Sequence, residues 1–87
     1  MPASYSLRIK KSAEKELKAL PKPDLQKVIQ RIHGLAADPR LLGCQKMSEQ
    51  SRYRIRQGDY RILYTIDDTD RVIEIVKIGH RREVYRR

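Results

Sequence analysis

The segment YRIRQGDYRILY, residues 53 to 64, carries three arginines at regular positions. Arg54, Arg56 and Arg61 alternate with tyrosine and isoleucine, a pattern typical of a strand with one buried face. A solvent-facing row of a strand needs no particular charge, so this row either solubilises the protein or faces an anion. A guanidinium presents a planar fork of donors that matches phosphate oxygens.

The turn inside this segment determines where the arginines lie. Gly58 and Asp59 fit the two central positions of a tight hairpin, because glycine adopts the positive φ that such turns require. This turn pairs Arg56 with Arg61 and places all three arginines on one face, whereas a register one residue away would mix apolar and charged residues. Like charges directly opposite each other repel, which favours a functional role for this face.

The next turn, DDTD at residues 67–70, is expected to pair Ile66 with Arg71. Continuing this register pairs Arg61 with Val76. Leu63 and Val76 then form the floor beneath the arginines. The acidic turn could bind a cation, but a polar hairpin turn accounts for its composition, and no metal site is predicted.

The chain ends in KIGHRREVYRR, which adds further candidates. Gly79 allows the chain to leave the last strand and return beside the open face. A positive environment favours the phenolate of Tyr85; the alternative role of this tyrosine is to pack the C-terminus in place. His80 is either a proton donor or a surface residue. The predicted phosphate-binding residues are Arg54, Arg56, Lys77 and Arg82.

The surrounding pattern predicts an α+β fold with two antiparallel helices on one face of an antiparallel sheet. A strand at 4–10 precedes a helix with Ser12 as its N-cap, and Pro21 separates it from a second helix that Pro39 ends. Apolar spacing of the i, i+3, i+4 type marks the second helix. Residues 40–52 form a loop that could contain a short strand near its end, and three strands follow at 53–57, 60–66 and 71–78.

The composition indicates one small basic domain spanning residues 1–87. The chain has 87 residues and a formal net charge of +9, which favours a polyanionic partner. Cys44 is the only cysteine, so an internal disulfide is excluded and a reducing compartment is expected. No signal peptide or membrane-spanning stretch is evident, and a cytoplasmic protein is predicted.

The segments YRIRQGDYRILYTIDD and VIEIVKIGHRREVY, together with the order of elements, resemble the RelE/ParE superfamily of bacterial toxins, and most closely its RelE branch. The resemblance covers nearly the whole chain. It implies a type II toxin that acts as a ribosome-dependent endoribonuclease and cleaves mRNA in the A site of the 30S subunit without a cofactor. Its implied catalytic residues are Arg61, Arg81 and Tyr85.

The resemblance also implies a mechanism and a partner. The ribose 2′-oxygen would attack the adjacent phosphorus, with Tyr85 accepting or orienting the 2′ proton and with Arg61 and Arg81 stabilising the phosphoryl oxygens. The best-known members carry lysines where this chain has Arg54 and Arg56, and arginine cannot act as a base. A shorter gap after Gly79 leaves Arg82 as an alternative to Arg81. The implied partner is an acidic RelB-like antitoxin in a hetero-oligomeric complex.

Two other functions fit the same sequence. A ParE-like inhibitor of DNA gyrase would use this fold without RNA chemistry, and fold alone does not separate the two. A non-catalytic RNA-binding module would use the arginines for phosphate contacts and Tyr85 for packing.

Overall fold

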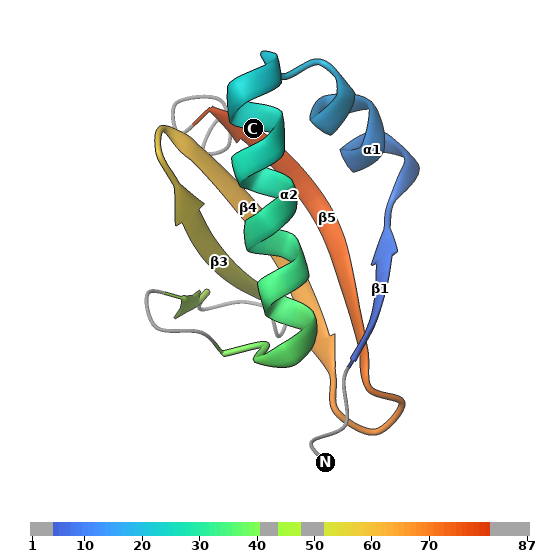
Figure 1. The fold of residues 1–87 in the computed structure, drawn as a ribbon. Coiled ribbons are helices and arrows are strands. Elements are labelled where there is room, and N and C mark those ends of the chain that lie inside the picture. Colours follow the sequence, from blue (N-terminus) through green and yellow to red (C-terminus); the bar gives the residue numbers. More distant parts are fainter. Residues whose placement is uncertain (1–4, 41–43, 48–51, 81–87) are drawn as a thin grey trace.

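The computed structural model describes residues 5–40, 44–47 and 52–80. It is a two-layer α+β domain in which two helices cover one face of a five-stranded sheet (Figure 1). The elements, in chain order, are β1 (Ser6–Ile9), α1 (Lys11–Lys18), α2 (Lys22–Ala37), β2 (Gln45–Lys46), β3 (Arg52–Gln57), β4 (Tyr60–Asp67) and β5 (Val72–His80). The predicted fold class is therefore confirmed.

The sheet has the strand order β1-β5-β4-β3-β2. β1 pairs with β5 in parallel, whereas the other neighbours are antiparallel. The loop after α2 contains a short strand, β2, but this strand lies in the middle of the predicted loop and not near its end. Since β1 and β2 form the two edges, the C-terminal meander occupies the centre of the sheet.

The start of α2 agrees with the position of its proline, whereas the start of α1 differs from the prediction. Pro23 lies in the first turn of α2, where a missing amide hydrogen is tolerated. The predicted N-cap Ser12 is wrong: α1 begins at Lys11, Lys10 is its N-cap, and no side chain caps it. The chain enters α1 directly from β1, so the extended Lys10 ends the strand and starts the helix.

The core lies between the helices and the sheet, and it is built from aliphatic residues and one tyrosine. Its members alternate along β4 and the first half of β5, and they recur at helical spacing along α1 and α2. The buried cluster consists of Ala13, Leu17, Val28, Ile32, Leu35, Ile55, Ile62, Tyr64, Ile73, Ile75 and Ile78. Because this layer covers one face only, residues of the opposite parity on β3 and β4 point to the other face.

The hairpin between β3 and β4 has the predicted register. Arg56 lies opposite Arg61, and Arg54 lies opposite Leu63. Gly58 has a φ of 61°, in the left-handed region that glycine adopts readily. The turn chemistry therefore places the three arginines on the face that the helices leave open.

The register predicted for β4 and β5 is wrong. Ile66 pairs with Ile73, and Arg61 pairs with Gly79 rather than Val76. A β-bulge interrupts the ladder between Leu63 and Tyr64, and it falls at Val76 on β5. Strict alternation after Ile75 would have turned Lys77 into the core; the extra residue turns Ile78 inward instead. Leu63 is buried on the arginine face as expected, but its neighbour across the ladder is Lys77.

On the side away from β4, the end of β5 is held by a helix instead of a strand. β1 pairs with β5 only as far as Ile75, and α1 covers the edge beyond that point (Figure 1). One carboxylate oxygen of Glu16 accepts a hydrogen bond from the backbone N–H of Ile78 at 2.9 Å, and the other accepts from Lys77 Nζ at 2.9 Å. Glu16 thus supplies the edge hydrogen bond that β1 does not reach.

We expect Glu16→Ala to lower the free energy of unfolding by about 1–3 kcal/mol, because it leaves a partly buried N–H without its acceptor. Glu16→Gln retains an acceptor and should lose roughly half as much. Chemical denaturation measures both. Glu14→Ala is the control, since Glu14 forms only an exposed ion pair with Lys18 and should change stability by less than about 0.5 kcal/mol. Equal losses for Glu14→Ala and Glu16→Ala would contradict this role for Glu16.

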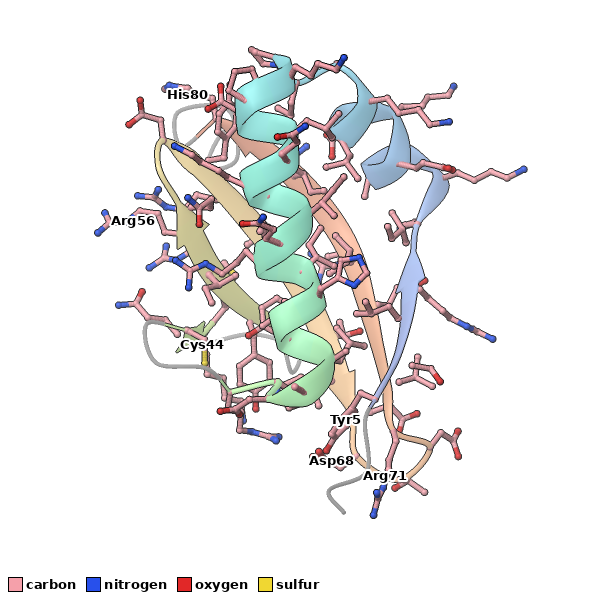
Figure 2. All side chains as sticks on the ribbon, viewed as in Figure 1. Tyr5, Cys44, Arg56, Asp68, Arg71 and His80 are labelled. Carbon is pink, nitrogen blue, oxygen red and sulfur yellow. The ribbon has the colours of Figure 1, made fainter. Side chains whose placement is uncertain are left out.

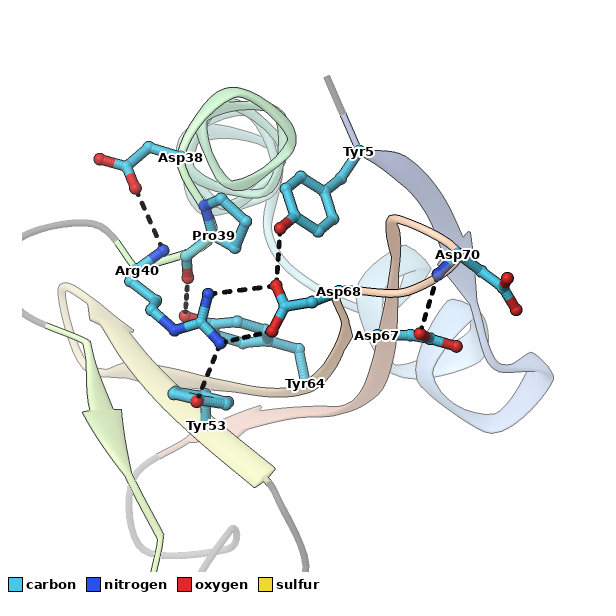
Figure 3. A network of polar contacts seen from close by, with 9 residues as sticks. All are labelled: Tyr5, Asp38, Pro39, Arg40, Tyr53, Tyr64, Asp67, Asp68 and Asp70. Carbon is cyan, nitrogen blue, oxygen red and sulfur yellow. Dashed lines mark hydrogen bonds and ion pairs between the residues drawn. The ribbon is translucent and has the colours of Figure 1, made fainter. Parts of the chain in front are cut away.

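A second polar network ties the loop after α2 to the β4–β5 turn (Figure 3). Arg40 donates to both carboxylate oxygens of Asp68, at 3.0 and 3.3 Å, and Tyr5 donates to the same carboxylate at 2.6 Å. Arg40 also lies over the ring of Tyr53, 5.4 Å from its centre. These contacts join the start of the described chain, α2 and the central hairpin at one end of the sheet.

The hydrogen bonds from Arg40 and Tyr5 lower the pKa of Asp68. A carboxylate with a lowered pKa stabilises the fold above its unfolded pKa, and this stabilisation is lost as the pH falls through the folded pKa. The wild-type protein should lose stability as the pH falls below about 4, and Asp68→Asn should lose slightly less over the same range. Thermal unfolding between pH 2 and 7 checks this, and the difference should shrink in high salt because the group is exposed. An unchanged acid profile in low salt would count against the network.

Candidate phosphate site

Three arginines and one glutamine line a cavity of about 150 Å³ on the open face of the sheet. We call it the arginine cavity; its lining residues are Gln45, Arg54, Arg56 and Arg61. Arg54 and Arg56 come from β3, Arg61 from β4 and Gln45 from the edge strand β2. The sequence had placed the arginines on one face, and the structure brings them around one hollow.

The arginines differ in their exposure. Arg56 is exposed and points away from α2 at the β3 side of the sheet (Figure 2). Arg54 and Arg61 are half-buried, and the Nη1 atom of Arg61 is shielded from solvent. The partner of Arg61 on β5 is Gly79, which has no side chain to occupy the space beside the guanidinium. The bulge in β5 contributes to this register, in which Gly79 and not Val76 lies opposite Arg61.

The arginine cavity suits an anion of moderate size. Its volume is large enough for a phosphoryl group, because a single water needs only about 10–15 Å³ of such space. None of the four described residues that line it is acidic. Guanidinium groups donate hydrogen bonds and do not lose their protons, so this site can bind an anion and stabilise added negative charge.

Two further candidates do not line the arginine cavity. The ammonium of Lys77 is bound by Glu16, and it borders a separate hollow of about 400 Å³ beside the α1–α2 connection. His80 borders the same hollow and meets the ring of Tyr60 edge-on, with 5.9 Å between ring centres. Since Tyr60 packs against the core, its cross-strand neighbour His80 lies on the helix-covered side.

Three predicted site residues, Arg81, Arg82 and Tyr85, lie outside the described residues. Within the described ranges, no three His, Cys, Asp or Glu side chains are grouped so that they could hold a metal ion. In the same part of the chain, neither α1 nor α2 combines the length and apolar character needed to cross a bilayer. Cys44 is a half-buried free thiol beside the core.

Gln45 is the cavity residue that sequence reasoning missed. Its side chain accepts a hydrogen bond from Nη2 of Arg54, which lies directly opposite it in the β2–β3 pairing. The available signal was weak, because a two-residue strand has no alternation to read. Because residues 40–52 are predicted to be mainly a loop, the sequence assigns Gln45 no partner on β3.

These features define a small basic α+β domain with a cavity on its open sheet face that can bind an anion. A family model described as the ParE toxin of type II toxin–antitoxin systems matches residues 7–85. The chain is 33% identical over 85 residues to toxin RelG of Mycobacterium tuberculosis, covering 95% of this chain and 98% of that protein. It is 31% identical over 84 residues to toxin RelE of the same organism, covering 94% and 87% respectively.

Solved structures of RelE toxins are also similar to this chain. The archaeal RelE–RelB complex from Pyrococcus horikoshii contains a chain that superposes with a TM-score of 0.79 at 30% identity, covering 90% of this chain and 96% of that one. Isolated Escherichia coli RelE superposes with a TM-score of 0.79 at 20% identity, covering 88% and 84%, which supports the fold. The chain therefore belongs to the RelE/ParE superfamily of toxins from type II toxin–antitoxin systems.

Proposed function

We propose that this toxin is a ribosome-dependent endoribonuclease that cleaves mRNA in the decoding A site and so inhibits translation. The observation that carries the proposal is the arginine cavity, in which three guanidinium groups surround a space of phosphate size. The similarity to RelE and RelG toxins over nearly the full chain supports the same function. The net charge of +9 favours binding to a polyanion.

The proposed reaction is an internal transesterification of RNA. The ribose 2′-oxygen attacks the adjacent phosphorus, and a new bond from phosphorus to the 2′-oxygen forms as the bond to the 5′-oxygen breaks. Tyr85 accepts the 2′ proton as its phenolate, which the surrounding positive charge favours, and water supplies the proton that the departing 5′-oxygen takes up. The products are a 2′,3′-cyclic phosphate and a 5′-hydroxyl.

The arginines have distinct roles in this proposal. Arg54 and Arg56 bind flanking phosphates, while Arg61, together with Arg81 or Arg82, stabilises the charge that grows on the phosphoryl oxygens. Because arginine retains its proton, none of these residues acts as a base. The ribosome extends and orients the message, so free RNA should be cleaved weakly.

The proposed partner is an acidic RelB-like antitoxin that folds over the basic surface of the toxin. RelE chains in the solved complexes are bound to RelB antitoxins. An antitoxin that covers the arginine cavity would neutralise the toxin by excluding the message.

Primer extension on mRNA bound to purified ribosomes tests the proposal. New 5′ ends at A-site codons are expected within the first minutes after the toxin is added. A protein that binds RNA without generating these ends would be a non-catalytic module, and the proposed chemistry would be rejected.

Inhibition of DNA gyrase is the second candidate, because the family model that matches the chain is that of ParE. A gyrase inhibitor needs no phosphate-sized cavity lined by three arginines. Immediate arrest of translation after expression would favour the ribonuclease. Induction of the SOS response and filamentation, with translation continuing, would favour the gyrase inhibitor.

A further inference from the structure

We infer that Gln45 is a positioning residue of the arginine cavity, which holds the guanidinium of Arg54 in place without neutralising its charge. The inference rests on the proposed function, because it assigns a role to a residue within the phosphate site. It concerns a side chain on the edge strand β2, outside the arginine-rich segment.

The backbone brings Gln45 to Arg54. β2 pairs with β3 so that Gln45 lies directly opposite Arg54, and the N–H of Met47 donates to the carbonyl of Arg52 at 2.8 Å. Paired residues in a sheet project from the same face. The glutamine side chain therefore emerges beside the arginine, at the rim of the arginine cavity.

The chemistry of the pair fixes how the carboxamide is oriented. A guanidinium only donates hydrogen bonds, so the atom of Gln45 that meets Nη2 of Arg54 must be the carbonyl oxygen. With its carbonyl oxygen directed at Arg54, the glutamine turns no acceptor toward an anion in the arginine cavity.

The function of Gln45 in this proposal depends on its being polar but uncharged. A carboxylate at this position would form an ion pair with Arg54 and would repel a phosphate across the cavity. An apolar residue would remove this hydrogen bond and with it one restraint on the arginine side chain, so that more ordering on binding would weaken the complex. A carboxamide avoids both effects, because it restrains the guanidinium and adds no negative charge of its own.

The test measures how strongly the variants bind a 2′-O-methyl RNA oligonucleotide, which cannot undergo attack by the 2′-oxygen. We expect Gln45→Leu to weaken binding about tenfold, the loss of one hydrogen bond to a charged group, and Gln45→Glu to weaken it about 100-fold through added repulsion. Single-turnover cleavage on ribosomes should fall in the same order. Lys46→Gln is the matched control, since it alters the neighbouring residue of β2 and removes a charge.

A double-mutant cycle with Arg54→Ala separates positioning from a structural role. If Gln45 acts through Arg54, Gln45→Leu will have little further effect once Arg54 is alanine, while Lys46→Gln will have the same effect in both backgrounds. Equal losses from Gln45→Leu in both backgrounds, or no loss in either, would overturn the inference. If oligonucleotide binding follows the expected cycle but no variant and no wild-type protein cleaves mRNA, the proposed ribonuclease function fails while the role of Gln45 stands.

Discussion

Arg61→Ala is expected to slow single-turnover cleavage of ribosome-bound mRNA by about 10²–10³-fold, the usual effect of removing one donor that stabilises transition-state charge. Arg61 is a half-buried guanidinium of the arginine cavity, with a solvent-shielded Nη1 atom and a glycine opposite it. A charge held away from water acts more strongly on a developing anion than an exposed one. Growth arrest on expression should be lost.

Two controls show whether the loss is chemical. The variant should keep the thermal unfolding midpoint of the parent, because Arg61 points away from the core. Arg8→Ala removes the same charge from β1, at the opposite edge of the sheet, and it should leave the cleavage rate within a few-fold of the parent, since a distant exposed charge acts mainly through screened electrostatics. An Arg61→Ala protein that remains fully toxic would remove this arginine from the phosphate site.

The arginine face was predictable because turn chemistry and alternation agree there. Gly58 allows the tight turn, and the apolar residues on both sides of it permit only one register with a single buried face. Three arginines on the other face follow without any tertiary information. The lining of the arginine cavity by those same arginines confirms this part of the interpretation.

The β4–β5 register was not predictable by assuming strict alternation. The apolar residues of β5 do not keep a period of two, since Ile73 and Ile75 are followed by Ile78. That break is the sequence signal of the bulge. The turn also differs from expectation, because Arg71 adopts a φ of 56°, and a non-glycine residue in this region is hard to foresee from sequence.

The contacts of Gln45, Glu16 and Arg40 depend on tertiary packing, so no local pattern reveals them. Glu16 has the spacing of an ordinary exposed helix residue, yet it binds the edge of β5. Arg40 follows a proline in a loop, yet it bridges α2 and the β4–β5 turn. The contacts of Glu16 and Arg40 join residues 62 and 28 positions apart in the chain, and sequence periodicity carries no information at that range. Gln45 and Arg54 are only 9 positions apart, but they pair across a loop.

The stability of the site depends on Tyr64, the largest of the fully buried side chains. Its side chain is fully buried in the centre of β4, its ring stacks on Tyr53 with 5.8 Å between ring centres, and its hydroxyl donates to the backbone carbonyl of Pro39 at 2.8 Å (Figure 3). One side chain thus fills the core and ties the end of α2 to the sheet. The arginine cavity lies on the other face of the same strands, so it forms only if this packing is intact.

Tyr64→Ala is expected to lower the free energy of unfolding by about 3–5 kcal/mol, the usual effect of removing a buried aromatic side chain. Because native proteins are stable by only about 5–15 kcal/mol, this variant should be partly unfolded at 37 °C and should lose toxicity without any change in the arginines. Urea denaturation measures the loss. Tyr53→Ala, at a half-exposed position in the same stack, should have a clearly smaller effect, and a loss below about 1 kcal/mol for Tyr64→Ala would contradict the packing described.

Tyr64→Phe separates the ring from the hydroxyl. It should lower stability by only about 1 kcal/mol at neutral pH, since it removes one hydrogen bond and keeps the packing. Burial raises the pKa of the Tyr64 hydroxyl, so the folded state retains this proton at a pH where the unfolded chain, with a pKa near 10, releases it. A raised pKa gives stability that is complete below the unfolded pKa and lost as the pH rises through the folded pKa. The stability of the parent should therefore fall as the pH rises above about 10, and Tyr64→Phe should fall less steeply. Parallel alkaline profiles for the two proteins would show that the hydroxyl ionises equally well in both states, against the burial that the structure gives it.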